Sequence, residues 1–182
     1  MSYYSLPQIQ TDAQKVPCTT LLPLPHLGHL SGNPSQTLEN NTSLSLPLWL
    51  AEMLLIAPAP NTPAAITMDL PPPLQHRVVN ALKANPVTLD LRAQAPHFYA
   101  LGARMLELFE DEDLVEVLLE TFRTRAVEIA DRASGGVGGR AAGDEGGFLL
   151  GLEEEEKRLW EASREGSASV GKWLGSERVE DL

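Results

Sequence analysis

The sequence predicts an α+β protein in which a small β-rich domain is followed by a mainly α-helical bundle. Most of the 14 prolines lie before residue 74, and after a proline triplet at residues 71–73 apolar residues recur at helical spacing. Prolines exclude long helices and keep strands short, whereas apolar residues at i, i+4 and i+8 are typical of an amphipathic helix. We therefore expect a β-rich domain over residues 1–70 and a helical domain over residues 71–182, with a glycine-rich loop at 134–147.

The first domain is expected to contain two short strands and one helix. Residues 18–24 and 64–70 have β-branched and apolar residues in partial alternation, which is typical of strands. Between them, residues 47–55 read "PLWLAEMLL". Pro47 suits the first helical position, and the leucines that follow share one face of a helix. The sequence therefore predicts a small α+β module.

The second domain is predicted to consist of four helices, over about residues 74–84, 96–109, 114–132 and 148–173. Asp90 or Thr88 is expected to cap a short turn between the first two, and Pro96 suits the start of the second. Acidic residues at 110–113 suit the start of the third, because they face the positive end of its dipole. One side of the third helix is expected to face the core of the domain. It carries Val115, Leu118, Leu119, Phe122, Ala126, Ile129 and Ala130.

The charge of the chain argues against direct nucleic-acid binding. Its formal net charge is −11, and the part after Lys83 holds 21 acidic and 11 basic residues, a net −10. Affinity for phosphate backbones comes largely from Lys and Arg side chains that displace counterions. We therefore expect protein partners, some of them basic, and no sequence-specific contact with nucleic acid.

The single cysteine and the lack of long apolar runs indicate an intracellular setting. Cys18 has no second cysteine with which to form an internal disulfide, and the first residues lack the basic and apolar pattern of a secretory signal. The longest apolar run, residues 46–57, is too short to span a bilayer and contains Glu52. The sequence predicts no membrane contact.

No motif supports catalysis, a metal or a cofactor. His26 and His29 near Cys18 do not supply the four ligands of a closed zinc site. The glycines at 135–139 lack the strand and the Gly-Lys-Ser/Thr ending of a phosphate loop. The four glutamates at 153–156 are expected to form a solvated helix start, since consecutive helical residues point in different directions.

His97 is the residue that comes nearest to a catalytic candidate. It lies in the first turn of the helix predicted over residues 96–109, where the helix dipole lowers the pKa of an imidazole. A general base would need a convergent acid or nucleophile, and the sequence shows none at a telling spacing. We expect a capping or packing histidine, and a small enzyme centred on His97 remains the alternative.

The aromatic residues exceed what a small helical bundle must bury. The candidate core or subunit-interface residues are Trp49, Phe98, Tyr99, Leu101, Met105, Leu108, Phe109 and Phe122. Aromatic and leucine-rich excess on short helices is typical of an interface with other proteins.

Two segments carry a resemblance to a known family. "LSLPLWLAEML" at residues 44–54 is followed by "MDLPPPLQHRVVNALKANPVTLDLRAQAPHFYALGARMLELF" at 68–109. The order of these motifs is similar to that of the Psf three family of GINS complex subunits. The starts "MSYY" and "TDAQKVPC" look like fungal members. The match is dense from about residue 44 to residue 133.

The resemblance implies a non-catalytic scaffold. Members have a β-rich domain and then a helical domain, and they pack with Psf one, Psf two and Sld five into a tetramer. That tetramer joins the MCM ring and the Cdc forty-five protein in the nuclear replicative helicase, for initiation and elongation of DNA replication. The segment from Pro96 to Tyr99 would begin a central helix of the helical domain. The alternative is a helical adaptor subunit of another nuclear complex.

Overall fold

A computed structural model describes residues 5–32, 36–56, 64–134 and 145–180. The chain divides into two compact units. The first comprises Met1–Gln75 with Ala103–Phe109, and the second comprises His76–Gly102 with Glu110–Leu182. Helix α5 (Phe98–Leu108) contributes its first turn and a half to the second unit and the rest to the first. Each unit is described by itself below.

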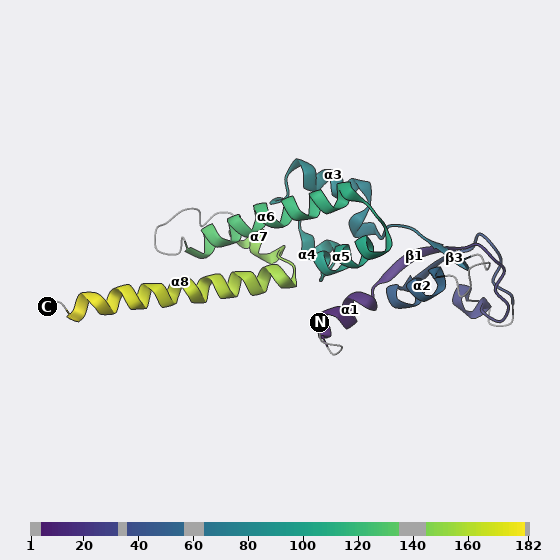
Figure 1. Cartoon of the computed structure of the whole chain (residues 1–182), viewed down its shortest axis with the longest axis horizontal. Coiled ribbons are helices and arrows are strands. Elements are labelled where there is room, and N and C mark those ends of the chain that lie inside the picture. Colours follow the sequence, from purple (N-terminus) through teal and green to yellow (C-terminus); the bar gives the residue numbers. More distant parts are fainter. Residues whose placement is uncertain (1–4, 33–35, 57–63, 135–144, 181–182) are drawn as a thin grey trace. The chain divides into compact units, whose positions relative to one another are not determined.

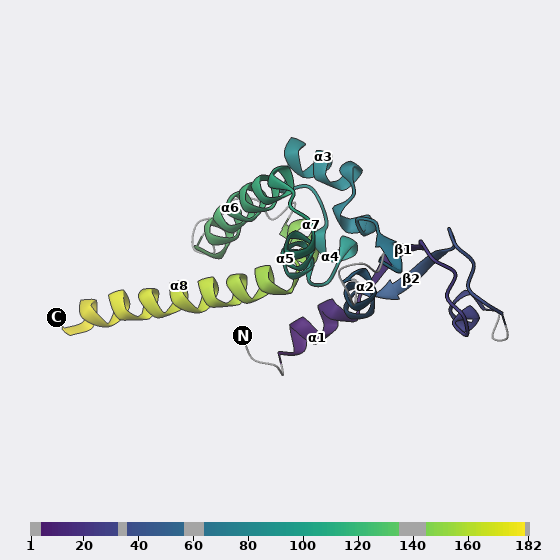
Figure 2. The same cartoon turned by 45° about the vertical axis from the view of Figure 1, so that its right-hand side comes forward.

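The first unit is built on a three-stranded antiparallel sheet. Its elements are α1 (Leu6–Asp12), β1 (Lys15–Thr20), η1 (Gly28–Ser31), β2 (Ser43–Pro47), α2 (Leu48–Leu55), β3 (Ile66–Met68) and η2 (Pro72–Leu74). The strand order is β2-β1-β3, so β1 lies at the centre. Strands β1 and β3 are labelled in Figure 1, and β1 and β2 in Figure 2. Cys18 of β1 faces Leu44 of β2 and Met68 of β3 in the register.

A period of two along β1 builds the small core of this unit. Val16, Cys18 and Thr20 are buried, whereas Lys15 is exposed. Helix α2 packs on the sheet and buries Leu48. Alternating side chains of a strand point to opposite faces of a sheet, so one face of β1 carries the whole buried set.

The fold class of the first unit is as predicted, but its elements differ in detail. The strand expected at 18–24 lies at Lys15–Thr20, because the chain turns away before Pro23 and Pro25. Pro47 is the last residue of β2 and the N-cap of α2, not the first helical residue. Helix α1 and strand β2 were not predicted. Both are short, and short elements carry little periodic signal.

The second unit is a bundle of helices. Its elements are α3 (His76–Ala84), α4 (Leu91–Gln94), the start of α5, α6 (Glu112–Ser134), α7 (Glu145–Leu150) and α8 (Glu154–Glu180). Helices α6 and α8 lie side by side, and α3 packs against α6 (Figures 1 and 2). The later part of α8 projects beyond the other helices of the unit, and its residues 164–174 are exposed.

Helix starts in this unit follow the expected capping chemistry. The Asp90 carboxylate accepts a hydrogen bond from the Ala93 backbone N–H at 2.8 Å and caps α4. The Asp111 carboxylate accepts one from the Leu114 N–H at 3.0 Å at the start of α6. Side-chain oxygens here satisfy N–H groups that have no partner inside the helix.

The buried face of α6 differs from the predicted one. Val115, Leu119, Phe122 and Ala130, all assigned to the core side, are exposed. The buried residues of α6 are instead Leu114, Val117, Leu118, Thr121, Arg125, Ile129 and Ala133. The prediction followed the apolar stripe, whereas the folded unit buries a face that carries a threonine and an arginine.

The single helix predicted over 148–173 is divided into α7 and α8 by a break at residues 151–153. The break accommodates a close approach to the start of α4. A Cβ at Gly151 would lie 3.2 Å from the Asp90 Cα, and the Gly151 carbonyl accepts a hydrogen bond from the Arg92 N–H at 3.3 Å. The greater part of the predicted glycine-rich loop, residues 135–144, lies outside the described residues.

Candidate functional site

A buried ion pair joins α6 to α8 at the centre of the second unit. Arg125 Nε donates to Glu156 Oε1 at 2.6 Å, and Arg125 Nη2 donates to Glu156 Oε2 at 2.8 Å. Both side chains are 1% exposed. A guanidinium and a carboxylate in this bidentate geometry form one of the strongest charge-assisted hydrogen-bonded pairs.

The remaining donors of Arg125 hold the surrounding backbone. Nη1 donates to the Pro86 and Leu89 carbonyls at 2.9 and 3.0 Å, and Nη2 donates to the Gly151 carbonyl at 3.4 Å. The guanidinium also lies 5.0 Å from the centroid of the Phe148 ring. All five N–H donors of this arginine are therefore used, and they join α6, the segment before α4, and the α7–α8 break.

Tyr99 connects the start of α5 to the same carboxylate. Its hydroxyl donates to Glu156 Oε1 at 2.9 Å. The ring makes edge-to-face contacts with Phe98 and Phe122, at centroid distances of 5.6 and 5.3 Å. Burial, followed by the Glu156 charge, raises the pKa of the Tyr99 hydroxyl, so the phenol stays protonated and acts as a donor.

Glu153 brings a second buried carboxyl into this cluster. Its Oε1 accepts a hydrogen bond from the Glu155 N–H at 3.0 Å, and the Glu153 N–H donates to Glu156 Oε2 at 3.3 Å. The two carboxylates thus satisfy backbone N–H groups at the start of α8, as capping side chains do. Burial raises the pKa of Glu153 to about 7, and the charge of Glu156 adds to the effect.

The predicted solvated start of the last helix is therefore wrong for two of its four glutamates. Glu153 and Glu156 are fully buried, while Glu155 is exposed. The only sign of this burial in the sequence is the spacing of Glu153 and Glu156. They are three residues apart, so both lie at the start of the same helix. Glu156 is buried against Arg125, which lies 31 residues before it in the chain.

The predicted residues of α5 are mostly buried. Phe98, Leu101 and Met105 are essentially without solvent exposure, whereas Leu108 and Phe109 are partly exposed. Phe98 and Leu101 belong to the second unit, and the other three belong to the first. These residues serve the cores of the two units.

Trp49 and Phe122, the remaining candidates, lie at the surface. Trp49 is 50% exposed on α2, next to exposed Met53 one turn further along the helix. Phe122 is 40% exposed on α6. It continues a line with Val115 and Leu119, which we call the α6 stripe. Neighbouring apolar side chains left open to solvent on one helix face indicate a binding surface.

Arg104 holds the helices of the first unit together. Its guanidinium pairs with Asp12 of α1 at 3.2 Å and with Glu52 of α2 at 2.7 Å, and also with Glu107 on its own helix. This arginine is partly exposed, and such pairs contribute little to stability. Their value is geometric, because one side chain links three helices.

The residues considered for chemistry lie in unreactive surroundings. His97 is 6% exposed, and its carbonyl accepts the first hydrogen bond of α5 from the Leu101 N–H at 2.9 Å. His97 is therefore the N-cap residue of α5. Burial, and to a lesser degree the Asp69 charge, raises the pKa of the Cys18 thiol to about 11, which suppresses the nucleophilic thiolate.

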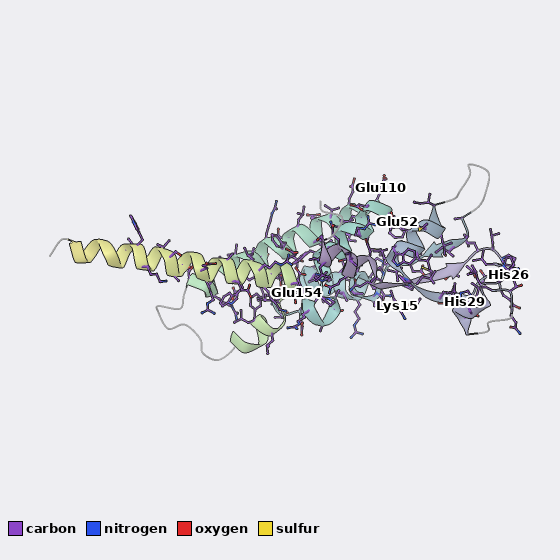
Figure 3. All side chains as sticks on the ribbon, turned by 90° about the horizontal axis from the view of Figure 1, so that it is seen from below. Lys15, His26, His29, Glu52, Glu110 and Glu154 are labelled. Atoms are coloured by element: carbon purple, nitrogen blue, oxygen red, sulfur yellow. The ribbon has the colours of Figure 1, made fainter. Side chains whose placement is uncertain are left out.

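His26 and His29 are exposed on the segment between β1 and β2, whereas Cys18 is buried in β1 (Figure 3). Within the described residues, no three His, Cys, Asp or Glu side chains are grouped so that they could hold a metal. Over the same residues, no helix is both long and apolar enough to cross a bilayer.

Comparison with known families assigns the chain. Residues 4–56 match the PSF3 N-terminal domain, and residues 73–175 match the GINS complex protein helical bundle domain. The chain belongs to the PSF3 family of GINS complex proteins. It is thus a non-catalytic structural subunit that serves DNA replication, and the resemblance seen in the motifs is confirmed.

Relatives match nearly the whole chain. The DNA replication complex GINS protein PSF3 of Phaeosphaeria nodorum is 50% identical over 173 residues, which cover 95% of this chain and 96% of the relative. The Aspergillus fumigatus protein of that name is 48% identical, with 96% and 97% coverage. The Saccharomyces cerevisiae protein is 34% identical, with 96% and 98% coverage. The similarity to these fungal PSF3 proteins therefore extends over both matched domains of this chain.

Proposed function

We propose that this PSF3-family chain uses its exposed helical faces to pack against the three sister GINS subunits, Psf one, Psf two and Sld five, in a heterotetramer. The observation that carries the proposal is the α6 stripe, in which Leu119 is 51% exposed between Val115 and Phe122. A subunit gains free energy when such a stripe is covered by a partner.

The end of α8 supplies a second surface of the same kind. Val170, Trp173 and Leu174 are each more than half exposed at i, i+3 and i+4 spacing. They lie on the part of α8 that extends beyond the other helices of its unit (Figure 2). A helix carrying apolar residues at this spacing suits packing against another helix.

Through the assembled tetramer, the chain acts in the nucleus with the MCM ring and the Cdc forty-five protein in the replicative helicase. Its own role there is structural, and nucleotide hydrolysis belongs to the ring. The net charge of −10 after Lys83 supports contacts with proteins over direct contacts with nucleic acid.

Co-expression with the three sister subunits tests the proposal. We expect a single peak on a sizing column with equal amounts of all four chains. The paired variant Leu119→Lys and Phe122→Lys should dissociate this chain from the others, since charged side chains would have to be buried at the contact. Val127→Lys, on another exposed side of α6, is the matched control and should assemble normally.

Normal assembly of the paired variant would remove the α6 stripe from the interface. Elution of the unmodified chain alone, without its sisters, would contradict the heterotetramer itself. Circular dichroism of each variant separates loss of folding from loss of assembly.

A further inference from the structure

A groove between α3 and α6 lies on the side of the bundle that the proposed assembly does not use. It is an open cavity of about 460 Å³ within the second unit. Its floor is apolar, with Leu82 and Pro86 from the α3 side and Val117 from α6. An α-helix turns 100° per residue, so Val117 lies about 200° around α6 from Leu119 of the α6 stripe. The groove and the stripe therefore face opposite sides of the helix.

One edge of the groove is a row of carboxylates. Asp113, Glu116 and Glu120 lie at i, i+3 and i+7 on α6, and all three are exposed. They span about 10 Å along the helix at 1.5 Å per residue. Within the described residues, none of the three forms an ion pair. Lys83 is the one basic residue among the groove-lining residues, so the groove is negatively charged.

Thr121 adds a polar side chain to the lining of the groove. It lies among the carboxylates, lines the cavity, and is 2% exposed.

We infer that the α3–α6 groove docks a basic amphipathic helix from a protein outside the GINS tetramer. Apolar side chains of that helix would cover Leu82, Pro86 and Val117, and its Lys or Arg side chains would pair with the carboxylates. A row at i, i+3 and i+7 matches cations at the same spacing on a second helix packed alongside. The open shape suits a helix better than a small ligand, which is ordinarily enclosed over most of its surface.

The inference rests on the proposed function in assigning the α6 stripe to the sister subunits. The experiment therefore begins with the assembled tetramer and a variant, Glu116→Lys with Glu120→Lys, that changes only the groove. The matched control is Glu161→Lys with Glu165→Lys. These two residues have the same spacing on α8, are exposed, and form no ion pair among the described residues.

A displayed library of helical peptides of about 15 residues, long enough to form a helix when bound, is selected on the unmodified tetramer. Binders of the groove variant are removed at each round. We expect selected peptides to carry at least two Lys or Arg residues at helical spacing beside apolar residues. Their affinity, measured by fluorescence polarisation, should fall about tenfold or more in the groove variant and change little in the control.

Three results would overturn the inference. Equal losses in the groove variant and the control would show general attraction to an acidic surface. Peptides without basic residues, or no selected peptides, would remove the basic helix. Spermine binding as tight as that of the peptides would indicate a small polycation instead.

Failure of the groove variant to join its sisters would make the groove part of the tetramer, whereas failure of the unmodified chain would contradict the proposed function.

Discussion

Arg125 and Glu156 form a bidentate ion pair, at 2.6 and 2.8 Å, in a part of the helical bundle that solvent does not reach. The pair joins the middle of α6 to the first turn of α8. The same arginine also binds three backbone carbonyls, so one side chain links α6, the start of α8, the segment before α4 and the α7–α8 break.

Removing either member of this pair should be strongly destabilising. Arg125→Met or Glu156→Leu alone leaves a buried charge without its counterpart, and we expect a loss of about 3–5 kcal/mol. The double substitution removes both charges and should cost much less than the sum of the single losses. Urea unfolding followed by circular dichroism measures each value.

Arg132→Met is the comparison for that experiment. Arg132 pairs with Glu128 one turn away on α6 at 2.6 Å, and both side chains are partly exposed. A pair of this kind contributes less than about 1 kcal/mol. Additive single losses for Arg125 and Glu156 would show that the buried pair does not act as a unit.

Glu153 should make the stability of the bundle depend on pH. Its pKa is raised by burial to about 7 from an ordinary value of 4.5, so the folded state holds a proton that the unfolded state releases. The contribution of Glu153 to stability is therefore fully present below the unfolded pKa and is lost between about pH 4.5 and about pH 7. Glu153→Gln keeps an oxygen that can accept from the Glu155 N–H but cannot ionise.

We expect Glu153→Gln to match the unmodified chain near pH 4.5 and to exceed it in stability above about pH 7, by up to about 3 kcal/mol. Thermal melts across this range measure the difference. Glu155→Gln, at an exposed neighbour, should show no such trend. If the Glu153→Gln variant were less stable than the original at pH 8, ionised Glu153 would have to be favourably bound.

Phe98 and His97 should differ in their contributions to stability. Phe98 is fully buried, and Phe98→Ala leaves a cavity that we expect to cost about 3–5 kcal/mol. His97→Ala removes a smaller, polar side chain at the helix N-cap and should cost about 1 kcal/mol. Unfolding curves of the two variants give the comparison, and co-purification of His97→Ala with the sister subunits should be unchanged. Equal losses would show that His97 carries more of the packing than its position suggests.

Cys18 should resist thiol reagents in the folded chain. The side chain is buried and its pKa is raised to about 11, so little thiolate is present at neutral pH. Reaction with Ellman's reagent should be slow in buffer and fast in urea, which provides a measure of opening of the sheet. Rapid reaction without denaturant would mean that β1 opens readily, and that the strand is less tightly held than its register implies.

The helix-forming patterns predicted the helices α3, α5 and α6, but not the division of the last helix into α7 and α8 or the face of α6 that is buried. On α6, Val115, Leu119 and Phe122 form the clearest apolar line, yet they are exposed. The face that is buried carries Arg125, whose charge is acceptable there because Glu156 arrives from α8. A pattern within one helix carries no information about a partner on another.

The local sequence indicated most of the longer helices of this protein, and the order of its motifs indicated the family. Prolines limited the first part of the chain to short strands and helices, apolar spacing set the helices of the second, and Asp90 capped α4 as its residue type allows. Each of these effects acts over a few residues, so it can be read directly from neighbours in the chain.

The buried charged groups at the centre of the bundle, by contrast, depend on the tertiary structure alone. Glu153 and Glu156 resemble the other glutamates of their run, and only the approach of Arg125 and the Tyr99 hydroxyl makes burial of Glu156 favourable. The free energy of a charge depends on the groups that replace water around it. Those groups come from 31 and 57 residues away in the chain, and only folding brings them together.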